Sequence, residues 1–159
     1  MRQNSLVKEK TIEAARKRIP FFVHLDLTYQ CNLECAHCYV VKENRPEMTT
    51  SKIKKLLEEL ADMGTLYLQL SGGEIFLRKD FFEIAEYARK LHFALRISTN
   101  GTLIDEKTAD KIASLYPERV SISVYSTNPQ VHDRITGVNG SLENTINCAR
   151  LLLERNVGV

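Results

Sequence analysis

The sequence predicts an α/β fold built on a parallel β-sheet. Short apolar segments alternate along the chain with amphipathic segments of helical periodicity, which favours parallel strands joined by right-handed crossovers. The polar motifs follow the apolar segments, where the carboxyl ends of such strands would lie. With 159 residues, the chain is one domain by size and can bury a core of its own.

Four apolar segments are expected to be strands, and each is followed by a segment with a helical pattern. The expected strands are Phe21–Leu27, Leu66–Leu70, Ala94–Ile97 and Arg119–Val124. The last residues, 157–159, are apolar and are expected to open a fifth strand. The chain would therefore hold about four and a half strand–helix units.

Polar residues mark the expected starts of the four helices. Ser51–Met63 carries leucine and isoleucine at helical spacing and should stop at Gly64. The third helix should end before Pro117, and the fourth should cover Leu142–Arg155. The expected N-caps are Thr50, Asp80, Asp105 and Ser141.

Within the strands, polar and apolar residues alternate, so one face of the sheet should be polar. The polar set comprises His24, Asp26, Thr28, Tyr67, Gln69, Ser71, Arg96, Ser98, Asn100, Ser121, Ser123 and Tyr125. Helices can cover the apolar face, whereas buried unpaired polar groups cost about 1–3 kcal/mol each. The polar face is then either a wet face of a half-open sheet or a concavity lined for a ligand. We favour the concavity, because the motifs lie at the edge of the same sheet.

Composition narrows the class of protein. Hydrophobic residues make up 43% and charged residues 26%, which is typical of a globular chain. The formal charge of +2 does not favour a nucleic acid or a membrane surface as partner, and no apolar run approaches the about 20 residues of a membrane span. Residues 1–19 are expected to be a basic helical segment. It lacks an apolar secretory core, so we expect a cytoplasmic protein.

Three cysteines form the most informative motif. Cys31, Cys35 and Cys38 have C-x3-C-x2-C spacing in a short segment after the first expected strand. Thiolates at such spacing suit an iron–sulfur cluster or zinc, and both prefer four ligands. Cys148 lies far along the chain in a helical pattern and is expected to fill the core. A cluster held by three cysteines would leave one iron open to a substrate or cofactor.

Two other interpretations of the cysteines remain. A structural zinc site could add His37 as fourth ligand, although its adjacency to Cys38 makes tetrahedral ligation by both awkward. Disulfides are less favoured, since a chain without an export signal stays reduced.

Three further motifs follow in order, and with the cysteines they carry a resemblance to a known family. They are Ser71-Gly72-Gly73-Glu74, Ser98-Thr99-Asn100-Gly101 and His132-Asp133-Arg134-Ile135-Thr136-Gly137. Together the four motifs resemble those of the radical S-adenosylmethionine (SAM) enzymes over about residues 19–159. The resemblance implies a partial (β/α) barrel with a [4Fe-4S] cluster on Cys31, Cys35 and Cys38. It also implies that the amino and carboxylate groups of SAM chelate the fourth iron.

The resemblance further implies the activity and the roles of individual residues. Reductive cleavage of SAM would give a 5′-deoxyadenosyl radical that abstracts hydrogen, and no residue is assigned as a catalytic acid or base. The glycines and carboxylate of the Gly72-Gly73-Glu74 motif would hold the methionine ammonium. The other expected SAM contacts are Ser98, Asn100, Ser123 and Arg134 for carboxylate or ribose, and His37 and Tyr39 for adenine.

Simpler roles compete with some of these assignments. Glu74 could be an acid at a helix start, Ser98 and Asn100 could belong to a simple Asn-Gly turn, and Arg134 could be a surface cation. Many relatives have an acidic residue where this chain has Tyr125, which puts the ribose contact there in doubt.

The motif at 132–137 is similar to that of the branch that matures peptides or cofactors and carries C-terminal SPASM or twitch domains. The expected partners are SAM, a peptide substrate, and an electron donor such as flavodoxin or ferredoxin. Residues 20–159 are then expected to be a C-terminally incomplete radical SAM core. The alternative function is a non-catalytic binding module stabilised by zinc or a cluster.

Overall fold

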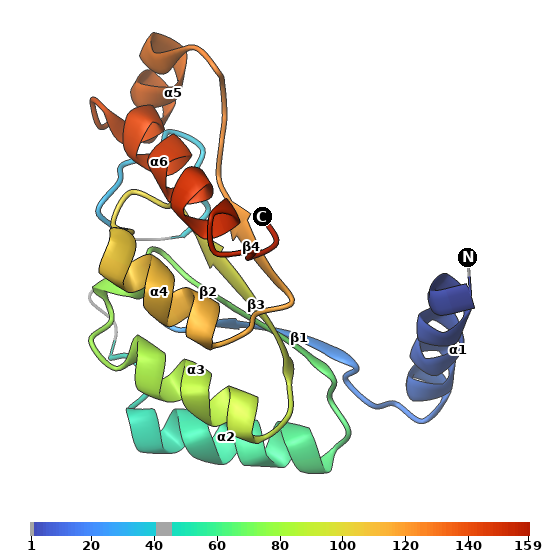
Figure 1. The fold of residues 1–159 in the computed structure, drawn as a ribbon. Helices are drawn as coiled ribbons and strands as arrows, with labels where there is room; N and C mark the ends of the chain where they lie inside the picture. Colours follow the sequence, from blue (N-terminus) through green and yellow to red (C-terminus); the bar gives the residue numbers. More distant parts are fainter. Residues whose placement is uncertain (1, 41–45) are drawn as a thin grey trace.

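The computed structural model describes residues 2–40 and 46–159, which form one parallel sheet with helices along one face. The strands are β1 (Phe22–Asp26), β2 (Tyr67–Ser71), β3 (Ala94–Thr99) and β4 (Arg119–Ile122). They lie in the order β1-β2-β3-β4, and every neighbouring pair is parallel (Figure 1). The predicted α/β class with parallel strands is confirmed.

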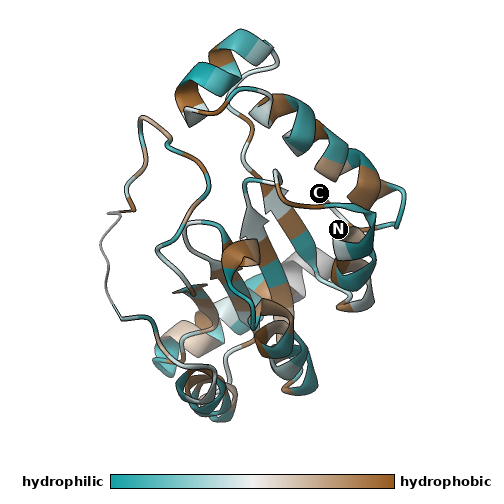
Figure 2. Ribbon diagram, turned by 90° about the vertical axis from the view of Figure 1, so that its left-hand side faces the viewer, coloured by the Kyte–Doolittle hydropathy of each residue, from teal (hydrophilic) through white to brown (hydrophobic). Residues whose placement is uncertain are grey.

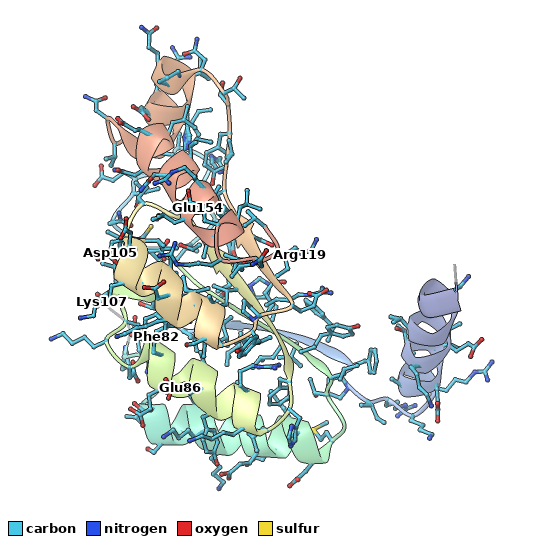
Figure 3. The ribbon with its side chains drawn as sticks, in the orientation of Figure 1. Phe82, Glu86, Asp105, Lys107, Arg119 and Glu154 are labelled. Atoms are coloured by element: carbon cyan, nitrogen blue, oxygen red, sulfur yellow. The ribbon has the colours of Figure 1, made fainter. Side chains whose placement is uncertain are left out.

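Helices connect the strands and cover one face of the sheet. The helices are α1 (Arg2–Arg16), α2 (Thr50–Asp62), the 3₁₀ turn η1 (Ile75–Leu77), α3 (Phe81–Lys90), α4 (Glu106–Ser114), α5 (Pro129–Thr136) and α6 (Ser141–Leu153). Helices α2, α3, α4 and α6 lie side by side along the sheet, whereas α1 stands apart near the start of β1 (Figure 1). Charged side chains such as Lys107 on α4 and Glu86 on α3 point away from the sheet (Figure 3).

The hydrophobic core lies between the sheet and these helices. Hydrophilic and hydrophobic residues alternate along the strands (Figure 2). The central members of the apolar set are fully buried under the helices, whereas Leu66 and Val124 at the strand ends are exposed. The central members are Leu68, Leu70, Leu95, Ile97 and Val120. On the opposite face, Gln69, Arg96 and Ser98 are half-buried and Ser121 and Ser123 are exposed. The predicted alternation is therefore confirmed, except that Thr28 and Ser71 are buried.

The helix starts agree only partly with the predicted caps. Asp105 caps α4 as expected, accepting a bond from the Thr108 amide at 2.8 Å. The cap of α2 is Thr49 instead of Thr50, which is the first residue of the helix. Asp80 precedes α3, but Arg78 and Thr50 occupy its carboxylate, so it makes no capping bond. Gly140 rather than Ser141 precedes α6.

The segment after β4 differs most from the expectation. Asn128 caps α5, and Pro129 occupies its first turn. This helix was not predicted, because eight residues give too short a window for a clear helical period. Residues 157–159 do not form a strand, although the Val120 amide donates to the Gly158 carbonyl at 2.8 Å. Within the described residues, no helix has the length and apolar content to cross a membrane.

Candidate functional site

A cavity of about 210 Å³ opens at the carboxyl edge of the sheet. It collects residues from the cysteine loop, the turn after β2, the end of β3 and the segment after β4. Its lining comprises Cys31, Leu33, Cys35, His37, Cys38, Tyr39, Val40, Ser71, Gly72, Gly73, Ser98, Thr99, Asn100, Ser123 and Tyr125. Every predicted site residue except Glu74 and Arg134 is among them.

The glycines after β2 let two loops pack backbone against backbone. The Gly73 amide donates to the Thr28 carbonyl at 2.8 Å, and the Glu74 amide donates to the Gln30 carbonyl at 2.7 Å. A Cβ on Gly72 would lie 2.4 Å from the Thr28 oxygen, and one on Gly73 would lie 2.2 Å from the Gln30 oxygen. Any side chain at either position would therefore separate the turn from the start of the cysteine loop.

A polar network at the end of β3 holds the first cysteine. The Asn100 amide nitrogen donates to Asn32 Oδ1 at 2.9 Å and lies 3.8 Å from Cys31 Sγ. Asn100 Oδ1 in turn accepts from the backbone amide and the hydroxyl of Thr102. Asn32 also donates to the Thr102 hydroxyl at 2.8 Å. Asn100 thus belongs both to a local turn, the simpler of its predicted roles, and to the wall of the cavity.

The three thiols of the loop lie close enough to influence one another. Burial raises the pKa of the Cys35 thiol, and the neighbouring Cys31 and Cys38 raise it further. Among the described residues, no group of three His, Cys, Asp or Glu side chains is already arranged to hold a single metal ion. Three thiols that line one cavity are a donor set that suits an iron–sulfur cluster or zinc.

The match to known proteins decides the family. The profile of the radical SAM superfamily matches residues 25–159, most of the chain. The chain belongs to the radical SAM superfamily. Members of this enzyme family bind a [4Fe-4S] cluster and SAM, so the cofactor prediction is confirmed for the family.

Individual relatives of this radical SAM chain are longer than it. The chain is 34% identical over 135 residues to the AdoMet-dependent heme synthase of Methanosarcina barkeri, which covers 83% of this chain and 39% of that protein. It is 34% identical over 147 residues to the subtilosin biosynthesis protein AlbA of Bacillus subtilis, covering 89% and 32%. The predicted resemblance to peptide and cofactor maturation proteins is therefore confirmed.

A solved relative supports the fold. Streptococcus suis SuiB bound to the precursor peptide SuiA gives a TM-score of 0.76 at 20% identity, over 96% of this chain and 35% of that one. The same protein has been solved bound to SAM. This likeness confirms the predicted fold class of the radical SAM chain.

Glu74 of this radical SAM chain lies beneath the cavity rather than in its wall. Its carboxylate is fully buried and accepts bonds from the Thr99 hydroxyl at 2.9 Å, the Asn100 amide at 2.8 Å and the Phe76 amide at 3.2 Å. Burial raises the pKa of the Glu74 carboxyl against the lowering effect of these bonds. The bond to Phe76 caps η1, which is the simpler role that the sequence allowed.

Arg134 also lies away from the radical SAM cavity. It is exposed on α5, where it lines a separate surface hollow together with Asp133 and Asn139. The structure therefore does not bring Arg134 together with the thiols or with the Gly72–Gly73 turn.

Tyr125 lies in the cavity wall, as expected of the polar face, although no contact with SAM was predicted for it. Its ring packs edge-on against His37 with centroids 4.5 Å apart, and against His132 at 5.6 Å. Burial is the main cause of its raised pKa, and the Cys35 thiol contributes as well. The period-two pattern of the polar face is the signal that places Tyr125 here, since it continues the series of Ser121 and Ser123.

Proposed function

We propose that this chain binds a [4Fe-4S] cluster through Cys31, Cys35 and Cys38, together with SAM, as part of an enzyme that matures a peptide or cofactor. The observation that carries the proposal is that three thiols share one cavity with a glycine turn and with hydroxyl and amide groups. When bound, the cluster would supply the electron that cleaves SAM to methionine and a 5′-deoxyadenosyl radical.

The residues around the thiols would hold SAM by neutral contacts. The Gly72 and Gly73 backbone offers a wall without side chains, so a ligand can approach the main chain closely. The Ser98 and Ser123 hydroxyls can donate to a carboxylate or ribose oxygen. His37 and Tyr39 present rings at the mouth of the cavity, where an adenine could stack.

The two predicted residues outside the cavity take different roles in this proposal. Glu74 would act as a positioning residue, because its carboxylate fixes the Asn100 backbone that turns toward Cys31. Contact between Glu74 and the methionine ammonium would require its buried carboxylate to leave the Thr99 hydroxyl. Arg134 would contact SAM only if α5 moved.

Relatives support the proposed substrate class, and the chemistry of the cluster supports the proposed electron donor. AlbA is named for bacteriocin biosynthesis and SuiB has been solved with a precursor peptide, so we propose a peptide as substrate. Flavodoxin or ferredoxin would supply the low-potential electron that a cluster of this kind needs. A cluster sensitive to oxygen would also suit the cytoplasm, where thiols stay reduced.

Metal analysis after anaerobic purification and reconstitution tests the proposal. We expect about four iron and four sulfide per chain, with loss of both in Cys35→Ala and retention in Cys148→Ala, the matched buried control. SAM should change the electron paramagnetic resonance spectrum of the reduced cluster. One zinc per chain without iron would instead support the non-catalytic module, and loss of iron in Cys148→Ala would refute the three-ligand site.

A further inference from the structure

The end of α5 is bonded to the cysteine loop on both sides of Cys35. The Glu34 amide donates to the Thr136 carbonyl at 2.8 Å, and the Ala36 amide donates to the Ile135 carbonyl at 2.9 Å. These are the backbone groups immediately before and after the middle cysteine. The position of Cys35 is therefore tied to the last turn of a helix that lies 100 residues further along the chain.

Gly137 permits this contact. It ends α5 in the left-handed region, with φ of +75°. A Cβ on Gly137 would lie 3.0 Å from the Glu34 Cβ and 3.1 Å from the Glu34 carbonyl oxygen. A side chain here would press on the residue next to Cys35, in addition to the strain of a left-handed backbone.

The last turn of α5 is itself anchored to the next helix. The Asp133 carboxylate accepts bonds from the Gly140 amide at 2.6 Å and the Leu142 amide at 3.0 Å. The hydroxyls of Thr136 and Ser141 lie 2.6 Å apart and are buried. The buried His132 ring also packs edge-on against Tyr125, with ring centroids 5.6 Å apart. The carbonyls that receive the loop amides thus belong to a braced turn.

We propose that the 132–137 motif is a positioning element for the cluster loop, with Gly137 as the residue that sets the distance between α5 and Cys35. The motif then acts on the cluster through the backbone of Glu34 and Ala36, and its arginine plays no part. This inference rests on the proposed function, because it concerns how the loop holds its cluster. Partners outside the ligands of a metal site typically alter metal affinity about 10- to 100-fold.

Gly140 provides a matched control for Gly137. Its φ is +78°, so alanine there meets a similar left-handed strain, but a Cβ on Gly140 has no atom within 4 Å. The variants Gly137→Ala and Gly140→Ala therefore differ mainly in contact with Glu34. If alanine at 137 prevents folding, the pair Gly137→Asn and Gly140→Asn repeats the test, since asparagine tolerates the left-handed region better.

The experiment measures iron retention during chelator challenge of the reconstituted full chain, with thermal unfolding of the iron-free protein. We expect retention about 10-fold or more weaker in Gly137→Ala than in Gly140→Ala, with similar unfolding midpoints. The reduced cluster of Gly137→Ala should also show an altered electron paramagnetic resonance spectrum. Equal retention and equal spectra in the two variants would overturn the proposal.

Amide hydrogen exchange in the iron-free chain separates this inference from the proposed function. The Glu34 and Ala36 amides should exchange slowly in the unaltered chain and in Gly140→Ala, and faster in Gly137→Ala. If the unaltered chain binds no iron but this pattern holds, the proposed function fails while the positioning contact stands. If these amides exchange equally fast in all three proteins, the positioning contact is refuted.

Discussion

The two faces of the sheet carry side chains of opposite character on the same strands. Under the helices, Leu95 and Ile97 of β3 are fully buried and belong to one continuous core. On the other face, Arg96 and Ser98 of the same strand are half-buried, and Ser98 accepts a bond from Gln69. Within one strand, every second residue packs in the core, and the residues between them keep their polar groups accessible on the other face.

This contrast separates stability from ligand binding within a single strand. Substitutions on the covered face should change the free energy of unfolding, whereas those on the open face should change the cavity and leave the fold intact. The exception is at the carboxyl edge, where the carboxyl group of Glu74 is buried on the helix side next to Thr99. Here the two functions overlap, because the same carboxylate supports both core and cavity.

The largest predicted effect is the difference in free energy of unfolding between Leu95→Ala and Ser98→Ala, which lie on opposite faces of β3. Leu95→Ala should lower the free energy of unfolding by about 2–5 kcal/mol, because it leaves a cavity in a fully packed core. Ser98→Ala should cost less than about 1 kcal/mol, since Gln69 can turn to water. Chemical denaturation of both iron-free variants measures the difference. Equal losses would mean that the open face carries as much of the stability as the covered one.

A smaller loss of stability is expected for a substitution of Glu74, which is buried at the carboxyl edge of the sheet. Glu74→Gln places an amide among the three donors that now meet a carboxylate, so at least one of them loses its acceptor. The free energy of unfolding should fall by about 1–3 kcal/mol, and the iron content should also fall as Asn100 shifts. If denaturation shows no loss but SAM no longer perturbs the cluster spectrum, Glu74 contacts SAM directly, as the sequence predicted.

The smallest effect on stability is expected for Asp133, which lies on α5 and belongs to neither face of the sheet. The Leu142 amide first, and then the Gly140 amide, hold the pKa of its carboxyl below the usual 3.8. A lowered folded-state pKa adds stability that is complete above the unfolded value and is lost as the pH falls through the folded value. Asp133→Asn should lower the thermal midpoint by a few degrees at neutral pH, and the two curves should converge as the pH falls through the folded-state pKa of Asp133. A constant difference down to that pH would refute the ionic cap.

The sequence predicts much of this fold because its strands carry a clear period-two signal. The fully buried Leu68 and Leu95, for example, follow directly from that alternation. The caps were harder to predict, since Thr49 and Thr50 are chemically equivalent and only the backbone decides between them. Helix α5 was not predicted because its eight residues are too few for a clear period, and the bonds that Asp133 and Thr136 make to Gly140 and Ser141 cannot be read from spacing.

The candidate site could be predicted where a residue contributes through its position after a strand. The cysteines, Gly72, Gly73 and Asn100 line the cavity as expected from the edge of a parallel sheet. The direction of a side chain is not encoded in such spacing, so the burial of Glu74 and the exposure of Arg134 had to come from the structure. The glycines also act by packing on Thr28 and Gln30, a tertiary contact that sequence spacing does not reveal.

Cys148 is a buried thiol whose labelling would report on opening of the helix layer. Its side chain packs against Gly101 on the covered face, and burial raises the pKa of its thiol to about 12. At neutral pH such a thiol is scarcely ever a thiolate, the form that alkylating reagents attack. Labelling of this single position in the iron-free protein therefore records how often the helix layer lifts from the sheet. Cys38 of the loop is exposed, so the same reagent reaches it without any opening of the helix layer.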